Sequence, residues 1–342
     1  MRIGLMTGGG DAPGLNGIIE ASCKTLLKMG HEVVGIHDGF EGIFGQRTLA
    51  LTESVVDGAH SFAGTLLGTS NKTGTKGREA EFLNQYEKLK LDGLIAAGGD
   101  GTFAGLKAFE SRIPLIGVPK TIDNDLSGTE ITFGYDTACS VVAESVDALR
   151  YTANAHHRVI VVETMGRTTG WICLGGGLAS YADAILIPER PYDETKLLEY
   201  LREKKSAGKR GLIIAVSEGA HSAGGQAQIA HVVKGSPQTE RYGGIAQLLA
   251  RWIEAQLGWE SRHVVLGHLQ RSRSPTTTDR FLTATMGVEV ARMVNDRAWG
   301  QAVVYRQGRI QRAPITDLMK PANLVHPEHR WVKLAQALGI FI

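Results

Sequence analysis

The most informative stretch of this chain of 342 residues is GVPKTIDNDL, residues 117–126. It continues from an apolar, strand-like run at 114–118 and sets Lys120, Thr121, Asp123 and Asp125 within six residues. One carboxylate of such a pair can accept a proton from an attacking hydroxyl, and the other can hold Mg²⁺, directly or through water. The lysine can neutralise charge on a phosphoryl group in transit. Because Asp-Asn-Asp is also good turn chemistry, the segment alone favours phosphoryl transfer and a structural turn about equally.

Two glycine-rich segments share one plan, in which a strand runs into a glycine turn and then into a helix. Residues 2–6 lead through a turn containing Gly10 into a helical pattern from 17 to about 29, and residues 93–97 lead into Gly98–Thr102 and a helical pattern over 103–109. Glycine lets the backbone approach an anion closely, and a helix N-terminus supplies free N–H groups. An aspartate in a phosphate loop, here Asp100, repels phosphate unless a cation bridges them, which indicates Mg²⁺. A single Gly-Gly-Asp would favour a structural turn, and neither segment matches the P-loop.

Taken in order, GGGDAPGLN, GGDGT, PKTIDNDL, ETMGR and GHLQR resemble the motifs of the phosphofructokinase family, from the N-terminus to about Arg292. The resemblance implies an α/β phosphofructokinase fold of two Rossmann-like lobes with mainly parallel sheets. It implies phosphorylation of fructose 6-phosphate to fructose 1,6-bisphosphate, a glycolytic step, with ATP–Mg²⁺ as donor. We expect residues 1–134 plus 270–320 to form the phosphoryl-donor lobe, and residues 135–269 plus 321–342 to form the sugar-phosphate lobe.

The hydrophobic pattern independently predicts alternating strands and helices, which is typical of parallel sheets covered on both faces. Ligands of such folds bind beyond the carboxyl ends of the strands, where every motif named above lies. Further strands are expected at 31–37, 158–163, 184–188, 211–217, 264–269 and 301–305, and helices at 79–91, 137–151, 193–204, 245–257 and 279–295.

The resemblance also implies catalytic roles. Asp123 is expected to be the general base that takes the proton of the sugar 1-hydroxyl. Asp125 and Asp100 would position the metal, with Asp100 as its ligand, and would order the base. Thr121 would bind the transferred phosphoryl group beside Lys120, while Arg167 and the Gly10 amide would stabilise charge developing on it.

Sugar-phosphate candidates lie at strand ends in the second half. Arginine suits phosphate because its planar fork donates two hydrogen bonds at once, although a lone arginine is more often part of a surface ion pair. Glu218 is expected to accept hydrogen bonds from sugar hydroxyls. Arg158 and Arg262 match positions that reach in from a neighbouring subunit, which implies a homodimer or homotetramer. The full set expected at fructose 6-phosphate is Thr121, Asp123, Arg158, Met165, Gly166, Arg167, Glu218, Arg262, His268 and Arg271.

The phosphoryl donor divides the family into ATP users and pyrophosphate users, and two positions give conflicting signals. Gly101 leaves room for the nucleotide α-phosphate where pyrophosphate users commonly carry a second Asp, whereas Lys120 is typical of pyrophosphate users. Because steric exclusion is the harder obstacle, we expect ATP. Phe40 is a candidate face for adenine, with a core aromatic as the alternative. The donor contacts expected are Gly10, Gly99, Asp100, Gly101, Thr102, Asn71, Lys72 and Phe40.

Departures from the family pattern leave other functions open. Asn71 replaces an arginine that normally contacts the donor phosphates, and Ser272-Arg273 replaces Gly-Gly, which permits another acceptor such as sedoheptulose 7-phosphate. A pyrophosphate-dependent enzyme and a non-catalytic sugar-phosphate sensor are further alternatives; a dinucleotide dehydrogenase is disfavoured because GxGxxG is absent. Glu20 and Glu53 stand near positions of effector-binding arginines, so we expect no activation by ADP and weak or absent inhibition by phosphoenolpyruvate.

Composition excludes several classes of partner. The chain is 43% hydrophobic and 21% charged with a net charge of +2, and its basic residues are dispersed, so we expect no nucleic-acid partner. Without a long apolar run or a signal-peptide pattern, we expect no membrane association. Cys23, Cys139 and Cys173 are far apart, which favours reduced thiols in a cytoplasmic protein.

Overall fold

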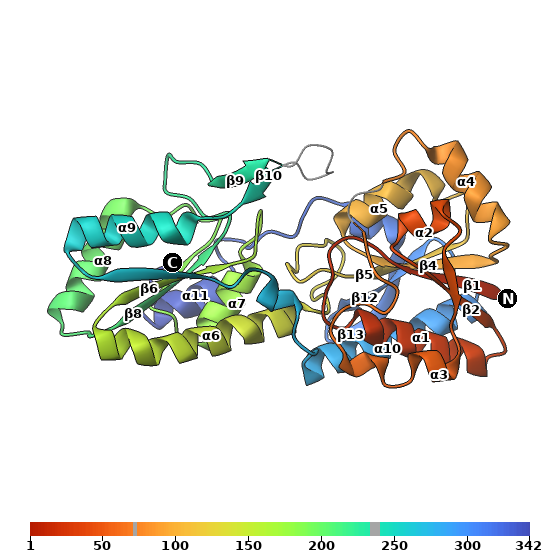
Figure 1. The fold of residues 1–342 in the computed structure, drawn as a ribbon, viewed down its shortest axis with the longest axis horizontal. Helices are drawn as coiled ribbons and strands as arrows, with labels where there is room; N and C mark the ends of the chain where they lie inside the picture. Colours follow the sequence, from red (N-terminus) through yellow and green to blue (C-terminus); the bar gives the residue numbers. More distant parts are fainter. Residues whose placement is uncertain (71–73, 233–239) are drawn as a thin grey trace. The chain divides into compact units, whose positions relative to one another are not determined.

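The computed structural model describes residues 1–70, 74–232 and 240–342 (Figure 1). Asn71 and Lys72, two of the expected donor contacts, lie outside the described residues. The described chain divides into two compact units. Unit 1 contains residues 1–70, 74–137 and 271–322, and unit 2 contains residues 138–232, 240–270 and 323–342.

Unit 1 is built on a seven-stranded sheet in the order β13-β12-β5-β4-β1-β2-β3. The five central strands are parallel, and the edge strands β3 and β13 pair antiparallel with their neighbours. Its strands are β1 (Arg2–Thr7), β2 (Glu32–Ile36), β3 (Thr48–Ala50), β4 (Gly93–Gly98), β5 (Leu115–Pro119), β12 (Gln301–Arg306) and β13 (Arg309–Pro314).

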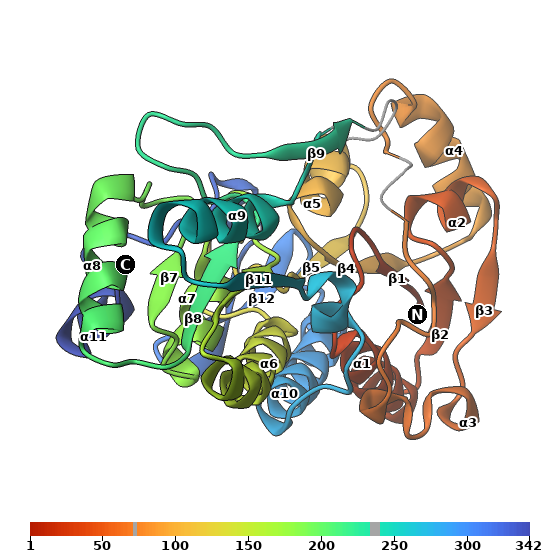
Figure 2. The same cartoon turned by 60° about the vertical axis from the view of Figure 1, so that its left-hand side comes forward.

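Both faces of this sheet are covered because side chains alternate between them along each strand. Ile3 and Leu5 of β1 point into one core layer beneath the helices α1 (Leu15–Lys28) and α10 (Thr277–Asn295). Met6 points into the other, with α2 (Phe40–Phe44), α4 (Glu79–Lys88) and α5 (Asp100–Leu106). Figure 2 shows α1 and α10 side by side below the sheet. The remaining short helices are α3 (Glu53–Val56) and the 3₁₀ turns η1 (Ala59–Ser61), η2 (Lys107–Phe109) and η4 (Ile315–Met319).

Unit 2 is built on a parallel four-stranded sheet in the order β11-β6-β8-β7. A separate antiparallel pair joins β9 (Ile229–Val232) and β10 (Glu240–Tyr242). Helices α8 and α9 pack their apolar faces on one side of the sheet, and α7 contacts the sheet as well. The elements are β6 (Val159–Thr164), β7 (Ala184–Leu186), β8 (Leu212–Ser217), β11 (Ser261–Val265), α6 (Tyr135–His156), α7 (Trp171–Ala179), α8 (Glu194–Ser206), α9 (Ile245–Leu257), α11 (Arg330–Ala337) and the 3₁₀ turn η3 (Gly267–Arg271).

The fold class expected from the sequence, an α/β phosphofructokinase fold with mainly parallel sheets, is confirmed. The strand expected at 264–269 is wrong, because β11 ends at Val265 and Gly267, with φ of 47°, turns the chain into η3. The helix expected at 103–109 instead begins at Asp100 and gives way to η2 after Leu106. None of the helices in the described part of the chain is long and apolar enough to cross a membrane.

Candidate active site

Three neighbouring strands of unit 1 end in the glycine and aspartate turns that the sequence indicated. The order β5-β4-β1 places these turns side by side at the carboxyl edge of the sheet. The Gly8 amide donates to Ala97 O at 2.9 Å, and the Lys120 amide donates to Gly98 O at 2.9 Å. A Cβ built on Gly8 would lie 2.6 Å from Thr102 Oγ1, so glycine permits the close packing of the first two turns. The three motifs therefore form one constellation.

Lys120 connects the third turn to the first. Its Nζ donates a hydrogen bond to Gly10 O, and a Cβ built on Gly9 would lie 3.5 Å from that same nitrogen. The residue is only 2% exposed. Burial and the neighbouring Arg271 guanidinium lower the pKa of Lys120 to about 8, although Asp11, Asp123 and Asp125 oppose them. A buried lysine whose protonation can change near neutral pH therefore lies against the glycine loop.

The two catalytic carboxylate candidates flank a buried pivot. Asn124 has φ of 52°, in the left-handed region that Asn tolerates better than most residues. Its side chain accepts from the Thr132 amide at 2.9 Å and donates to Glu130 O at 3.3 Å. The half-buried Asp123 and Asp125 stand on either side of this pivot. Thr121 Oγ1 accepts from the Asp123 amide at 3.1 Å, which fixes the start of the turn.

Asp125 lies in a field of negative charge. Burial raises the pKa of Asp125, and the Asp123 and Asp100 carboxylates raise it further, while a hydrogen bond from Thr121 opposes them. The second and third turns therefore bring three carboxylates close enough to repel one another. This repulsion favours a bound cation or a retained proton.

The donor set fits a magnesium ion that shares its coordination with a phosphate ligand. Asp100 is exposed at the first position of α5, near Asp125. In the part of the chain that the structure describes, no group of three or more His, Cys, Asp or Glu side chains is arranged to hold a metal. Mg²⁺ commonly takes only one or two protein carboxylates and completes its shell with water and substrate phosphates.

Arg271 belongs to the same constellation, although the sequence assigned it to the sugar phosphate. Its Nη1 donates to Asp11 O at 2.6 Å, and a Cβ built on Gly10 would lie 3.1 Å from Nη1. It is the first residue of unit 1 after the chain leaves unit 2. Its guanidinium therefore lies against the glycine loop of β1.

In unit 2, the expected sugar-phosphate residues form two groups at opposite ends of one strand. Met165, Gly166 and Arg167 follow the carboxyl end of β6, and Glu218 follows the carboxyl end of β8 beside it. The Glu218 amide donates to Thr164 O at 2.9 Å. The Met165 amide donates at 3.2 Å to Gln270 Oε1 on η3, the turn that also carries the exposed His268.

Arg158 and Arg262 form the second group, at the amino end of β6. Arg158 pairs with Glu260 at 2.8 Å, and Arg262 pairs with the same carboxylate at 2.5 Å. With a rise of about 3.3 Å per residue, β6 separates this end from Arg167 by roughly 20 Å. Within one chain, these two arginines therefore do not join Arg167 and Glu218.

Phe40 does not offer a face for adenine. It is only 6% exposed and packs edge-on against the Phe82 ring, with centroids 6.1 Å apart. A Cβ built on Gly105 of α5 would lie 2.9 Å from the Phe40 ring, so this ring fills the core beneath the helix. The adenine-binding role expected for Phe40 is therefore wrong, because its ring fills the apolar core between α2, α4 and α5.

Sequence reasoning missed the residues that shape the site without touching its chemistry. The sequence pattern indicates no role for Asn124 beyond a possible Asp-Asn-Asp turn, and no role for Asp11 beyond its place in the first glycine-rich segment. An Asn between two carboxylates in a short turn is a signal for a left-handed residue and could have identified the pivot. The Asp11 contacts, by contrast, connect residues far apart in sequence and have no local signal.

Comparisons with known proteins identify the family of this chain. The phosphofructokinase family model matches residues 2–294. "ATP-dependent 6-phosphofructokinase 2" of Clostridium perfringens is 38% identical over 99% of this chain and 97% of its own length, and "ATP-dependent 6-phosphofructokinase" of Chloroflexus aggregans is 40% identical with the same coverage.

Solved structures give the same picture of the fold. The phosphofructokinase of Saccharomyces cerevisiae superposes with a TM-score of 0.81 at 27% identity, over 98% of this chain and 46% of that one. A pyrophosphate-dependent phosphofructokinase from Nitrosospira multiformis superposes with a TM-score of 0.85 at 18% identity, over 100% of this chain and 92% of that one. The chain belongs to the phosphofructokinase family.

Proposed function

We propose that this protein transfers the γ-phosphoryl group of ATP to the 1-hydroxyl of fructose 6-phosphate, giving fructose 1,6-bisphosphate and ADP. The observation that carries the proposal is the convergence of the Gly10, Gly101 and Asp123 turns at one edge of a single sheet. The names of relatives at 38% and 40% identity over nearly the whole chain support ATP as donor.

In the proposed reaction, a bond forms between the sugar O1 and the γ-phosphorus while the bond from that phosphorus to the ADP oxygen breaks. Asp123 accepts the proton that O1 loses. Lys120 and the Gly10 amide stabilise the charge on the transferred group, and the resemblance to the family assigns Arg167 the same role. Because phosphoryl transfer needs mainly positioning and electrostatic stabilisation, this set is chemically sufficient.

Asp100 would hold a magnesium ion brought with the nucleotide, with Asp125 ordering the site beside it. When bound there, Mg²⁺ would supply charge stabilisation to the donor phosphates. The raised pKa of Asp125 supports this assignment, since a cation would relieve the repulsion among the three carboxylates.

The donor preference rests on the space at Gly101. A Cβ built there meets no heavy atom within 4 Å, and the residue is exposed at the start of α5. An Asp side chain at this position would project into the space that the proposal gives to the nucleotide α-phosphate. Lys120 is compatible with either donor, because its ammonium neutralises phosphate charge whichever group leaves.

Unit 1 is proposed to bind the donor and unit 2 most of the sugar phosphate. Arg158 and Arg262 lie too far from Arg167 along β6 to serve the same bound sugar in one chain. We therefore assign them to the site of a neighbouring subunit in a homodimer or homotetramer. Light scattering after size-exclusion chromatography tests this, and a monomer that is fully active would contradict it.

A substrate panel tests the function. Fructose 6-phosphate and sedoheptulose 7-phosphate are each assayed with ATP–Mg²⁺ and with pyrophosphate–Mg²⁺, with phosphorus NMR to identify the products. We expect fructose 1,6-bisphosphate from fructose 6-phosphate and ATP at the highest kcat/KM. A higher kcat/KM with sedoheptulose 7-phosphate or with pyrophosphate would replace the proposed substrate, and no product with any pair would favour a non-catalytic sensor.

A further inference from the structure

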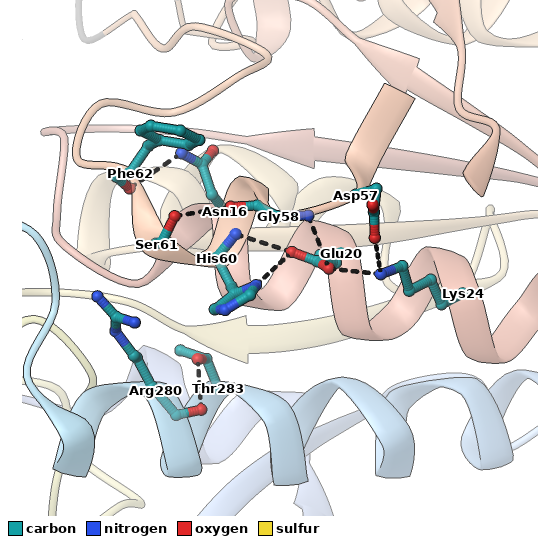
Figure 3. Close-up of polar contacts among 10 residues, drawn as sticks. All are labelled: Asn16, Glu20, Lys24, Asp57, Gly58, His60, Ser61, Phe62, Arg280 and Thr283. Atoms are coloured by element: carbon teal, nitrogen blue, oxygen red, sulfur yellow. Dashed lines mark hydrogen bonds and ion pairs between the residues drawn. The ribbon is translucent and has the colours of Figure 1, made fainter. Parts of the chain in front are cut away.

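Helix α1 carries a stripe of polar side chains that the proposed chemistry does not use. Asn16, Glu20 and Lys24 are spaced by four residues, so they share one face of the helix. Asn16 is 4% exposed and Glu20 is 7% exposed, so both are buried polar groups in a mostly apolar helix. All three side chains contact the segment Asp57–Ser70 (Figure 3). We call this segment the strap.

Glu20 fastens the beginning of the strap (Figure 3). Its Oε2 accepts from the His60 amide at 2.8 Å and contacts His60 Nδ1 at 2.7 Å, and its Oε1 accepts from the Gly58 amide at 3.2 Å. Lys24 Nζ lies 2.7 Å from both Glu20 Oε1 and Asp57 Oδ1, so it links Glu20 to the first residue of the strap.

The Glu20 carboxylate is ionised at neutral pH. Burial alone would raise the pKa of Glu20, but the hydrogen bonds from Lys24, His60 and Gly58 outweigh burial and lower it to about 2. Since the folded-state pKa lies below the unfolded value of 4.5, its contribution to stability is fully present above pH 4.5 and is lost only as the pH falls toward 2.

Asn16 fastens the middle of the strap. Its Nδ2 donates to Phe62 O at 3.2 Å and to Gly64 O at 2.8 Å, and its Oδ1 accepts from the Leu66 amide at 2.7 Å. Only an amide side chain has two donors and an acceptor in this arrangement. An aspartate at this position would face two carbonyl oxygens with nothing to donate.

The end of the strap is joined to the glycine loop of β1. The Thr65 amide donates to Asp11 Oδ1 at 3.2 Å, and Thr7 Oγ1 donates to Gly68 O at 2.7 Å. Thr69 Oγ1 donates to Gly9 O at 2.6 Å. The strap is therefore fastened to α1 at its beginning and middle, and it holds the loop above Lys120 at its end.

We propose that Asn16 and Glu20 are positioning residues for the phosphoryl donor, acting through the strap on the glycine loop. The inference rests on the proposed assignment of the donor to that loop. Both residues bind the strap, and the strap binds the loop, so we expect their loss to weaken donor binding. The alternative is a purely structural role, in which the loss of either residue weakens the binding of both substrates and lowers the stability of the fold.

The experiment uses two nearly isosteric variants, Glu20→Gln and Asn16→Asp, and a control, Glu53→Gln, which removes an exposed carboxylate from the neighbouring helix α3. Amide hydrogen exchange of peptides covering 57–70 is measured without nucleotide, and KM is measured separately for ATP and for fructose 6-phosphate. Thermal unfolding of each variant monitors the folded state.

We expect faster exchange in the strap and a KM for ATP raised roughly tenfold, the factor that corresponds to one lost positioning hydrogen bond. The KM for fructose 6-phosphate should change less than twofold, and Glu53→Gln should match the wild type. Faster strap exchange with an unchanged KM for ATP would overturn the inference. Equal increases in both KM values with a lower Tm would overturn it in favour of the structural role.

Two features keep the test decisive. If Glu20→Gln fails to fold, Asp57→Asn is measured in its place. This variant removes the ion pair between Lys24 and Asp57 at the beginning of the strap. Failure of the donor-site assignment itself would appear separately, as an unchanged KM for ATP in Lys120→Gln, whereas the exchange result does not depend on that assignment.

Discussion

Donor binding should depend on the protonation of Lys120, and this gives a sharp test of the electrostatics of the site. The pKa of Lys120 is lowered to about 8, because the side chain is buried and Arg271 is close. A polyanionic donor favours the ammonium form, so binding takes up a proton when the free enzyme holds a neutral amine. Donor affinity should therefore be constant below the pKa and should fall as the pH rises through it.

The magnitude follows from the titration curve. With a pKa of about 8, roughly nine-tenths of Lys120 is protonated at pH 7 and roughly one-tenth at pH 9. The KM for ATP should then rise about tenfold between these pH values, which corresponds to ~1.4 kcal/mol.

The assay is the steady-state KM for ATP at saturating Mg²⁺ and fructose 6-phosphate across this range. Lys120→Gln should bind ATP weakly with a flat pH profile, whereas Lys107→Gln, an exposed lysine following α5, should keep the wild-type profile. The reasoning is refuted if the wild type and Lys120→Gln show the same pH dependence.

Four further outcomes are expected. Asp123→Ser should lower kcat by at least ~100-fold with little change in fructose 6-phosphate binding, since only the base is lost; near-normal turnover would contradict the assignment. Gly101→Asp should fold normally, because its Cβ meets open space, yet raise the KM for ATP strongly; unchanged ATP use would remove the steric argument. Phe82→Ala should lower the free energy of unfolding by about 3–5 kcal/mol, because the ring is fully buried and stacks on a neighbour at 4.2 Å, whereas Phe281→Ala, at a residue 76% exposed, should change the Tm little in calorimetry. The carboxylate of Glu20 would repel a phosphate-bearing effector, so kinetics should show no activation by ADP and weak or absent inhibition by phosphoenolpyruvate. Sigmoidal curves relieved by millimolar ADP would be inconsistent with this.

The sequence was most informative where local pattern and chemistry coincide. Helix α9 was predicted over the same residues, 245–257, that form it, because its apolar face repeats with the helical period and Gly258 ends it in the left-handed region. The turns at Gly10, Gly101 and Asp123 were predicted to meet because parallel strands place their carboxyl ends along one edge, and the strand order brings them together.

Other features depend on contacts that have no local pattern. Phe40 follows a glycine turn and could equally have faced solvent; only the packing of α2, α4 and α5 around Phe82 decides that it is core. The strand expected through Leu269 ends early because Gly267 takes positive φ, which an apolar run does not reveal. Arg271 contacts Asp11 across 260 positions of sequence.

The strap likewise has no signal in the local sequence. Residues 57–70 contain little regular structure, with only the single turn of η1 over Ala59–Ser61. Their position is set by hydrogen bonds to Asn16 and Glu20, whose immediate neighbours along α1 are apolar or glycine and mostly buried. A polar stripe on a buried helix face indicates that something polar covers it, but the covering segment cannot be read from the helix itself.

The proposed function requires the glycine turns beside Asp123 to hold a single polyphosphate. A crystal structure with Mg²⁺ and the β,γ-imido analogue of ATP measures this directly. We predict the γ-phosphate within hydrogen-bonding distance of the Gly10 amide and Lys120 Nζ, with the metal on Asp100. An analogue bound elsewhere on the molecule, with these turns empty, would contradict the proposed function.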